Sequence, residues 1–355
     1  MQFSFMPLDL RLLLLLLLST LGLGGAGGAG AGTRGVPRET SVGLTRAVDG
    51  AEKAYAVTFE NADRSTLTLN TTPVHVTMLE TMRRVHKMDL VVLGEKVRWR
   101  GFATRVDEYM RWMNEGGNLT TNDTFVLLFD SRDVIFQMDW KTTVSALTKA
   151  YHAHGDRIVL STESWCCVRW LNNHRYIEPG MDRSVGCMKQ YREFMTNQSK
   201  LAASAAGWPA SPFSFINAGL MWGKVKNFKE LFAEMEPIYF GNMEHAPFDD
   251  QAKMAQVFFR KPSMFWLDYY HHYFSNSDRS NSIWWVPGNG CFFTWNETTR
   301  SFHNGVFTYN QTTRAFNGTT SVEPSKLGPL VIHTSGKHWS CFNQIYNKLL
   351  PTWEK

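Results

Sequence analysis

The sequence is poor in cysteine and lacks the spacing that makes cysteine a metal ligand. Five cysteines occur among 355 residues, and no two of them form a C-x-x-C pair. This argues against a zinc ribbon or a thioredoxin-like redox motif. Five thiols allow at most two internal disulfides and leave one odd thiol. The cysteines are Cys166, Cys167, Cys187, Cys291 and Cys341.

The sequence also lacks a strong excess of either positive or negative charge. The formal net charge is +5, from 37 basic and 32 acidic residues, and no basic run interleaved with aromatics is present. A nucleic-acid partner is therefore not expected. No internal repeat is visible. The 43% of hydrophobic residues suffices for a packed core in one large domain or two small ones.

The longest apolar run lies near the N-terminus. Arg11 precedes "LLLLLLLSTLGL", and the small-residue stretch "GGAGGAGAG" follows. The run is too short to span a bilayer comfortably. We therefore predict a cleaved signal peptide over residues 1–31, with an uncleaved signal anchor as the alternative, then a linker over 32–50 and one folded domain over 51–355. Signal cleavage would leave no stable membrane span.

Seven N-x-S/T sequons fit the same compartment, because this motif is the acceptor for N-glycosylation. Several lie in polar stretches typical of surface loops, although the motif alone does not imply occupancy. We expect the chain in the endoplasmic reticulum or Golgi lumen, or secreted. The sequons are at Asn70, Asn118, Asn122, Asn197, Asn296, Asn310 and Asn317.

Strands and helices alternate in the first half of the domain. The predicted strands are "AYAVTF", "DLVVLG", "FVLLF" and "RIVLST", and the predicted helices lie within "TPVHVTMLETMRRVHKM", "ATRVDEYMRWMNEG" and "WKTTVSALTKAYHA". This order favours an α/β domain with a largely parallel sheet and helices on both faces. Farther along we expect a strand in "PFSFINAGLMWG" and helices in "KNFKELFAEMEPIYF" and "FDDQAKMAQVFF".

Two aspartates follow the apolar strand "FVLLF". Asp130 and Asp133 stand three positions apart in "LLFDSRDVIF", where the loop after a strand meets the ligand-binding edge of an α/β sheet. Two carboxylates from one loop suit a hard divalent cation. The alternative is an Asx-type turn with no chemistry.

Seven blocks, taken in order, resemble the glycosyltransferase domain of the procollagen lysyl hydroxylases, the procollagen-lysine 2-oxoglutarate 5-dioxygenases. The resemblance covers about residues 54–353 and rests on "VVLGEKVRWRGF", "LLFDSRDVIF", "IVLSTESWCC", "FINAGLMWG", "FDDQ", "WLDYYHHYFSN" and "LVIHTSGKHW". It implies a GT-A-like fold, with a mostly parallel central sheet flanked by helices and an irregular C-terminal acceptor-side region. It also implies metal-dependent transfer of a hexose, glucose or galactose, from a UDP-sugar to a hydroxyl on a protein or glycan.

The resemblance implies a metal site made of Asp130, Asp133 and His333. The two aspartates match the family's D-x-x-D motif, and His333 matches its C-terminal histidine ligand. Such a set suits Mn²⁺ or another divalent cation, with donor diphosphate and water completing the shell. The cation would stabilise the departing nucleoside diphosphate. An isolated histidine beside a strand is the alternative for His333.

The same resemblance implies donor contacts. Thr58 and Trp99 match positions that contact uridine and ribose, although core burial is an equal alternative for Thr58. Arg132 replaces a nucleotide-stacking tyrosine. Gly336 and Lys337 match the diphosphate segment, with the lysine closer to the glycine than in the family pattern.

On the acceptor side, Asp249, Asp250 and Asn217 match the family's acidic run and the asparagine beside the donor sugar. Their alternatives are a helix cap for the aspartates, since acids are favourable at a helix N-terminus, and a turn residue for Asn217.

Several departures keep other functions open. Arg132 and Cys167 replace family aromatics, so a degenerate domain that binds glycans or proteins without turnover is one alternative. A glycoside hydrolase using Asp249 and Asp250 is another, but adjacent carboxylates rarely face each other across a sugar. The family's dioxygenase domain has no counterpart here, and lysyl hydroxylation is not expected.

Overall fold

The computed structural model describes most of the predicted folded domain. The described residues are 52–60, 75–99, 102–163, 187–208, 211, 213–235, 250–276, 293–296, 301–304, 307–310, 315–318, 329–334, 342–343 and 345–349. The chain divides into two units, Met1–Thr40 and Ser41–Lys355, and every described residue belongs to the second. The predicted signal peptide (1–31) and linker (32–50) lie outside the described residues and stay predictions.

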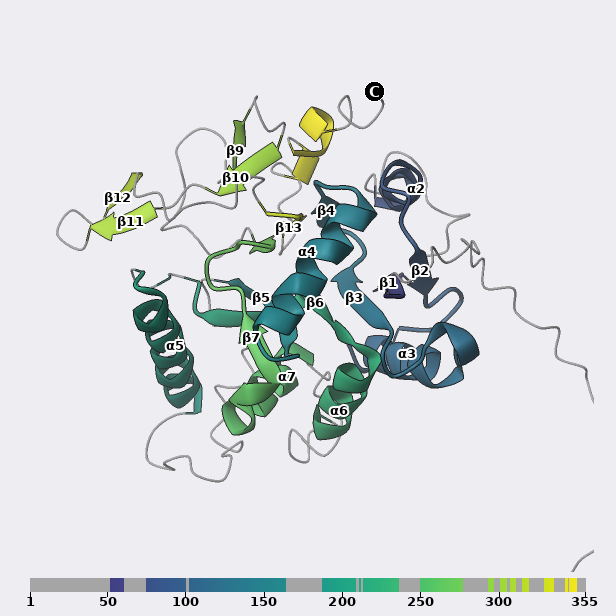
Figure 1. Cartoon of the computed structure of the whole chain (residues 1–355), viewed down its shortest axis with the longest axis horizontal. Helices are drawn as coiled ribbons and strands as arrows, with labels where there is room; N and C mark the ends of the chain where they lie inside the picture. The colour runs from purple at the N-terminus through teal and green to yellow at the C-terminus, as the bar shows by residue number, and fades with distance from the viewer. Residues whose placement is uncertain are drawn as a thin grey trace, which may run out of the picture. The chain divides into compact units, whose positions relative to one another are not determined.

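A six-stranded sheet forms the centre of the domain, in the order β2-β1-β3-β6-β5-β7 (Figure 1). The pairings β1 with β2, β1 with β3 and β5 with β7 are parallel, whereas β6 runs antiparallel to β3 and β5. The α/β fold with a mostly parallel sheet is confirmed. The strands are β1 (Ala54–Phe59), β2 (Leu90–Leu93), β3 (Phe125–Asp130), β5 (Ile158–Glu163), β6 (Phe215–Lys224) and β7 (Phe265–Leu267).

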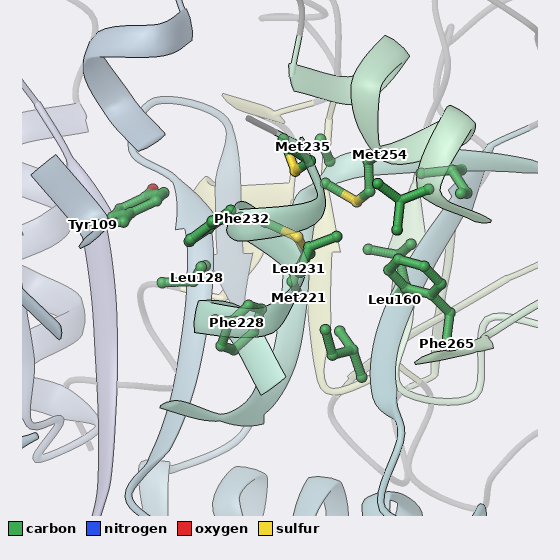
Figure 2. Close-up of a cluster of buried hydrophobic side chains, with 14 of the residues drawn as sticks. Tyr109, Leu128, Leu160, Met221, Phe228, Leu231, Phe232, Met235, Met254 and Phe265 are labelled. Atoms are coloured by element: carbon green, nitrogen blue, oxygen red, sulfur yellow. The ribbon is translucent and has the colours of Figure 1, made fainter. Parts of the chain in front are cut away.

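Helices cover both faces of this sheet, because alternate strand residues point to opposite sides. Val126 and Leu128 of β3 pack into one core cluster, and Leu127 and Phe129 into another. The first cluster contains side chains from α3, α6 and α7 (Figure 2) and also from α5, and the second contains side chains from α2 and α4. The helices are α2 (His75–Val85), α3 (Phe102–Glu115), α4 (Trp140–Ala153), α5 (Cys187–Ala206), α6 (Val225–Met235) and α7 (Asp250–Arg260).

A second, three-stranded sheet has the order β4-β13-β8 and closes over the end of β3. Its strands are β4 (Val134–Phe136), β8 (Phe274–Asn276) and β13 (Val331–His333). His333 pairs with Val134 of β4 on one side and Asn276 of β8 on the other. The loop between β3 and β4, residues 131–133, therefore lies where the two sheets meet.

The remaining described elements are short. Two antiparallel pairs consist of β9 (Phe293–Asn296) with β10 (Ser301–Asn304) and β11 (Phe307–Asn310) with β12 (Ala315–Gly318). Two 3-10 turns, Gly117–Leu119 and Pro262–Met264, join longer elements. Within the described part of the chain, the helices are too short or too polar to cross a bilayer.

Candidate metal centre

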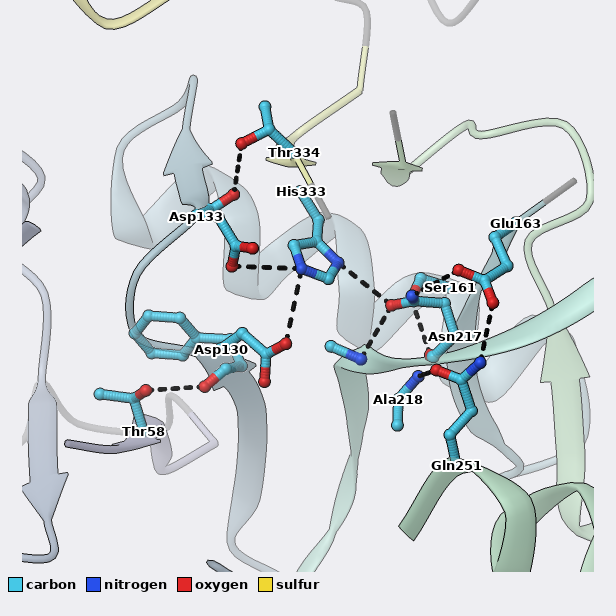
Figure 3. A network of polar contacts seen from close by, with 12 residues as sticks. Thr58, Asp130, Asp133, Ser161, Glu163, Asn217, Ala218, Gln251, His333 and Thr334 are labelled. Carbon is cyan, nitrogen blue, oxygen red and sulfur yellow. Dashed lines mark hydrogen bonds and ion pairs between the residues drawn. The ribbon is translucent and has the colours of Figure 1, made fainter. Parts of the chain in front are cut away.

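Asp130, Asp133 and His333 converge at the junction of the two sheets. Asp130 ends β3, Asp133 precedes β4, and His333 ends β13. One ligand atom from each lies within 4.8 Å of the others. His333 Nε2 is 3.3 Å from Asp133 Oδ1 and 3.5 Å from Asp130 Oδ2 (Figure 3). The structure thus brings together the three residues predicted as a metal set.

Hydrogen bonds from the backbone and from a side chain hold this loop in place. The Thr334 amide donates to the Asp133 carbonyl oxygen at 2.7 Å, which extends the pairing of β13 with β4. The Ser131 hydroxyl donates to Glu60 Oε2 at 2.9 Å, just beyond β1. The loop is therefore tied to both sheets, and the side chains of Asp130 and Asp133 remain directed at His333.

The charge balance of this centre favours a cation. His333 is 2% exposed. Burial alone lowers its pKa, but the carboxylates of Asp133 and Asp130 outweigh burial, so the pKa of His333 lies above its ordinary value. Among the described residues, Nε2 has no hydrogen-bond partner with good geometry. A proton or a metal ion at Nε2 is stabilised by the same two carboxylates.

Arg105 is a site residue that the sequence analysis missed. Its guanidinium, which comes from α3, forms ion pairs with both Asp130 and Asp250, and Arg105 Nε donates to Asp250 Oδ2 at 3.1 Å. Burial lowers the pKa of Arg105, but the two carboxylates raise it by more, so the group stays charged. The sequence did hold a signal for Arg105. It stands one turn before Tyr109 and two turns before Trp112, on the stripe of α3 that is buried.

Asp250 begins α7, as the helix-cap alternative expected, but it does more than start a helix. Its Oδ1 accepts from the Gln251 amide at 2.9 Å, and its Oδ2 accepts from Arg105. Burial raises the pKa of Asp250, and Arg105 opposes this rise without cancelling it. Asp249, Gly336 and Lys337, together with Cys167, lie outside the described residues, and their predicted roles stay predictions.

Arg132 points to Glu60 rather than to the metal cluster. Its Nη2 lies 2.9 Å from Glu60 Oε1 and its Nε lies 3.1 Å from Oε2, a bidentate pair. Glu60 is buried, whereas the Arg132 side chain is about half exposed. Arg132 therefore anchors the loop to the end of β1, and its predicted donor contact stays a prediction.

The two residues predicted to contact the nucleoside differ in accessibility. Thr58 is fully buried, and its hydroxyl donates to the Phe129 carbonyl oxygen at 2.7 Å. This burial agrees with the alternative interpretation of Thr58 as a core residue. Trp99 is 42% exposed. Its ring packs against Phe59 and Phe102, with both centroid distances at 5.5 Å, and the Arg105 guanidinium lies 5.3 Å from the Phe102 ring centre.

Asn217 lies behind His333 and is 4% exposed. Its Oδ1 accepts from the Gly219 amide at 2.8 Å and lies 3.1 Å from His333 Nδ1. Its Nδ2 donates to Glu163 Oε2 at 2.9 Å. Asn217 is thus a strand residue in a hydrogen-bond network rather than the turn residue of its alternative interpretation.

Comparison with known proteins gives only weak similarities, at low sequence identity. No family model matches the sequence. No curated protein matches it either. Among solved structures, the bifunctional glycosyltransferase WbbM is 13% identical, with a TM-score of 0.39 over 86% of this chain and 50% of its own. The present chain thus spans half of WbbM.

Two further solved structures differ in activity. The galactosyltransferase LgtC, in complex with donor and acceptor sugar analogues, is 13% identical over 83% of this chain and 95% of its own, with a TM-score of 0.36. The 4-diphosphocytidyl-2C-methyl-D-erythritol synthase of Anaerococcus prevotii is 13% identical over 61% and 88%, with a TM-score of 0.30. The resemblance to the lysyl hydroxylase glycosyltransferase domain stays a prediction.

Proposed function

We propose that the chain is a metal-dependent glycosyltransferase that moves a hexose, glucose or galactose, from a UDP-sugar to a hydroxyl on a protein or glycan. One observation carries the proposal: Asp130, Asp133 and His333 come from three separate strand ends and place their ligand atoms within 4.8 Å of one another. They do so at the edge of the sheet where α/β folds bind ligands.

The ligand set fits a divalent cation such as Mn²⁺. It offers two carboxylates and one imidazole, and the imidazole presents a buried Nε2 without a well-aligned partner among the described residues. When bound, the cation supplies Lewis-acid stabilisation of the diphosphate leaving group. Asp130, Asp133 and His333 Nε2 would hold it.

The neighbouring residues have roles that their contacts support. Arg105 holds Asp130 and Asp250 and adds a permanent positive charge beside the diphosphate position. Trp99 presents an exposed aromatic face on which a uracil ring can stack. Arg132 keeps the loop of Asp133 attached to Glu60. Asp250 would accept a hydrogen bond from a sugar hydroxyl, and its ion pair with Arg105 argues against a role as a free base.

A glycan- or protein-binding module without turnover is the second candidate. The observation that favours it is the ion pair between Arg105 and Asp130, because a cation must compete with the guanidinium for this carboxylate. The presence of Asp130, Asp133 and His333 together argues for turnover, because binding without turnover gives little reason to keep three metal ligands.

We also propose residence in the secretory pathway. The apolar run after Arg11 and the sequons support this compartment. Asn122 and Asn197 are exposed, so both are accessible to a glycosylating enzyme.

A donor screen tests the proposed activity. The chain expressed in a secretory system is incubated with UDP-glucose, UDP-galactose and other UDP-sugars, with Mn²⁺ or with chelator, and released UDP is measured. We expect release with one hexose donor in Mn²⁺ only. No release with any donor, together with retained glycan binding, would favour the binding module.

A further inference from the structure

We propose that Asn217 is a positioning residue that sets the His333 ring for metal coordination. Its side-chain oxygen keeps a proton on His333 Nδ1, so that Nε2 is the nitrogen that bonds the cation. Glu163 in turn fixes the orientation of Asn217. The inference rests on the proposed metal site and assigns Asn217 to the histidine ligand instead of to the donor sugar.

The orientation of the Asn217 amide follows from its neighbours. Oδ1 lies 2.8 Å from the Gly219 amide nitrogen, which can only donate. Nδ2 donates to Glu163 Oε2 at 2.9 Å. The reversed amide would place donor against donor and acceptor against acceptor. The oxygen of Asn217 therefore faces His333.

The His333 tautomer follows from the amide orientation. Asn217 Oδ1 carries no proton, so at 3.1 Å the His333 Nδ1 must donate to it. In the neutral ring the lone pair is then on Nε2, which faces Asp133 at 3.3 Å and Asp130 at 3.5 Å. Nδ1 keeps its proton in both the neutral and the charged ring, so a metal displaces only the Nε2 proton.

Gly219 lets the imidazole approach the strand closely. A Cβ at this position would lie 2.2 Å from His333 Cε1 and 2.5 Å from Nδ1. Asn217 and Gly219 are two apart in β6 and thus face the same side of the sheet. One residue bonds the ring while the other leaves room for it.

A chain of hydrogen bonds supports Asn217 from behind (Figure 3). Glu163 Oε1 accepts from Gln251 Nε2 at 2.8 Å, and Gln251 Oε1 accepts from the Ala218 amide at 3.2 Å. The chain joins the end of β5, the first half of β6 and the first turn of α7. Because Glu163 and Asn217 are both buried, the network has little freedom to change its hydrogen-bond directions.

The contribution of Asn217 can be measured without enzyme turnover. Hydrogen-bond partners behind a histidine ligand typically change metal affinity by about 10- to 100-fold. We therefore expect Asn217→Ala to weaken Mn²⁺ binding by about that factor in calorimetry. In the metal-free protein, ¹⁵N NMR of the neutral His333 ring should show the Nδ1-H tautomer for the wild type and loss of that preference for Asn217→Ala.

A charge-swapped double variant provides the rescue. Asn217→Asp with Glu163→Gln exchanges the amide and the carboxylate while keeping their shapes. The introduced carboxylate would still accept from His333 Nδ1, and the introduced amide would donate to that carboxylate. Affinity and tautomer should return toward wild-type values, and this variant also carries the test if Asn217→Ala does not fold. Asn227→Ala is the matched control, because Asn227 bonds Tyr151 and the Lys224 amide beyond the opposite end of β6.

The outcomes separate the two proposals. Equal Mn²⁺ affinity in the wild type and Asn217→Ala, with an unchanged tautomer, would overturn the positioning role and leave the metal site standing. Absence of Mn²⁺ binding in the wild type would overturn the proposed function and the ligand role of His333 together. Weakened affinity that the double variant restores, with no effect of Asn227→Ala, is the expected result.

Discussion

Arg105 of α3 and Asp250 of α7 form a buried ion pair between residues 145 positions apart. The same guanidinium reaches Asp130 at the end of β3. One cation thus compensates a predicted metal ligand and a predicted acceptor residue, and connects two helices across the candidate site.

We expect Arg105→Met to lower the free energy of unfolding by about 3–5 kcal/mol, because Asp250 and Asp130 lose their buried countercharge. Urea unfolding at neutral pH measures this loss. Arg111→Met, which removes an exposed pair with Glu108 in the same helix, should cost at most about 1 kcal/mol.

A double-mutant cycle isolates the pair. Asp250→Asn should cost less in the Arg105→Met background than in the wild type, because the carboxylate no longer has a partner to lose. Strictly additive losses would show that the two side chains do not stabilise each other.

Asp133→Asn should reduce UDP-sugar turnover by about a hundredfold or more, because a lost metal carboxylate removes transition-state stabilisation. The fold should survive, because the Asp133 backbone carbonyl, which the substitution keeps, bonds Thr334. The melting temperature should fall only through the lost charge beside His333. His333→Ala should lose turnover as well. Asp123→Asn, at an exposed aspartate, is the control. Unchanged turnover in Asp133→Asn would indicate that the aspartate serves only the turn.

The strands and helices with strong apolar patterns were predictable from the sequence. The strand in "FVLLF" is confirmed as β3 because a continuous apolar run suits a strand covered on both faces. Helix α5 was not predicted. Its buried stripe is Tyr191, Met195, Ser199 and Ala203, four residues apart, and a serine and an alanine weaken the apolar signal. The three-residue strands β4, β8 and β13 are too short for a periodic pattern.

The candidate site was predictable only in part. Asp130 and Asp133 stood at the end of an apolar strand, His333 was implied only by the family resemblance, and the structure brings the three together. Asn217 and His333 are 116 positions apart, and their contact depends on β6 and β13 meeting in space. No local pattern encodes such a contact, nor the partnership of Arg105 with Asp250. The β-α-β-α order also did not predict that β6 runs antiparallel to β3 and β5.

Acid should destabilise the fold through two buried histidines. Burial lowers the pKa of His86 to about 4 and that of His271 to about 3, whereas in the unfolded chain both titrate at about 6.5. Stability from these groups is therefore fully present above about pH 6.5 and is lost as the pH falls toward the folded values, by up to about 3 kcal/mol for His86.

The difference between variants checks this pH dependence. His86→Gln should flatten the loss of unfolding free energy between about pH 6.5 and 4 relative to the wild type. Parallel curves for the wild type and His86→Gln would contradict the assignment.

A secretory-pathway protein should carry N-linked glycan on exposed sequons. We expect treatment of the cell-expressed chain with an N-glycosidase to increase its gel mobility, and Asn122→Gln to reduce that shift, because Asn122 lies exposed before β3. The absence of any mobility change in the wild type would count against lumenal residence.

Calorimetric titration of UDP into the wild-type chain, once with Mn²⁺ and once with chelator, tests the central claim most directly. If Asp130, Asp133 and His333 hold a cation that bridges the protein to the diphosphate, UDP should bind in Mn²⁺ and show no measurable heat in chelator. Equal UDP affinity under both conditions would contradict the metal bridge.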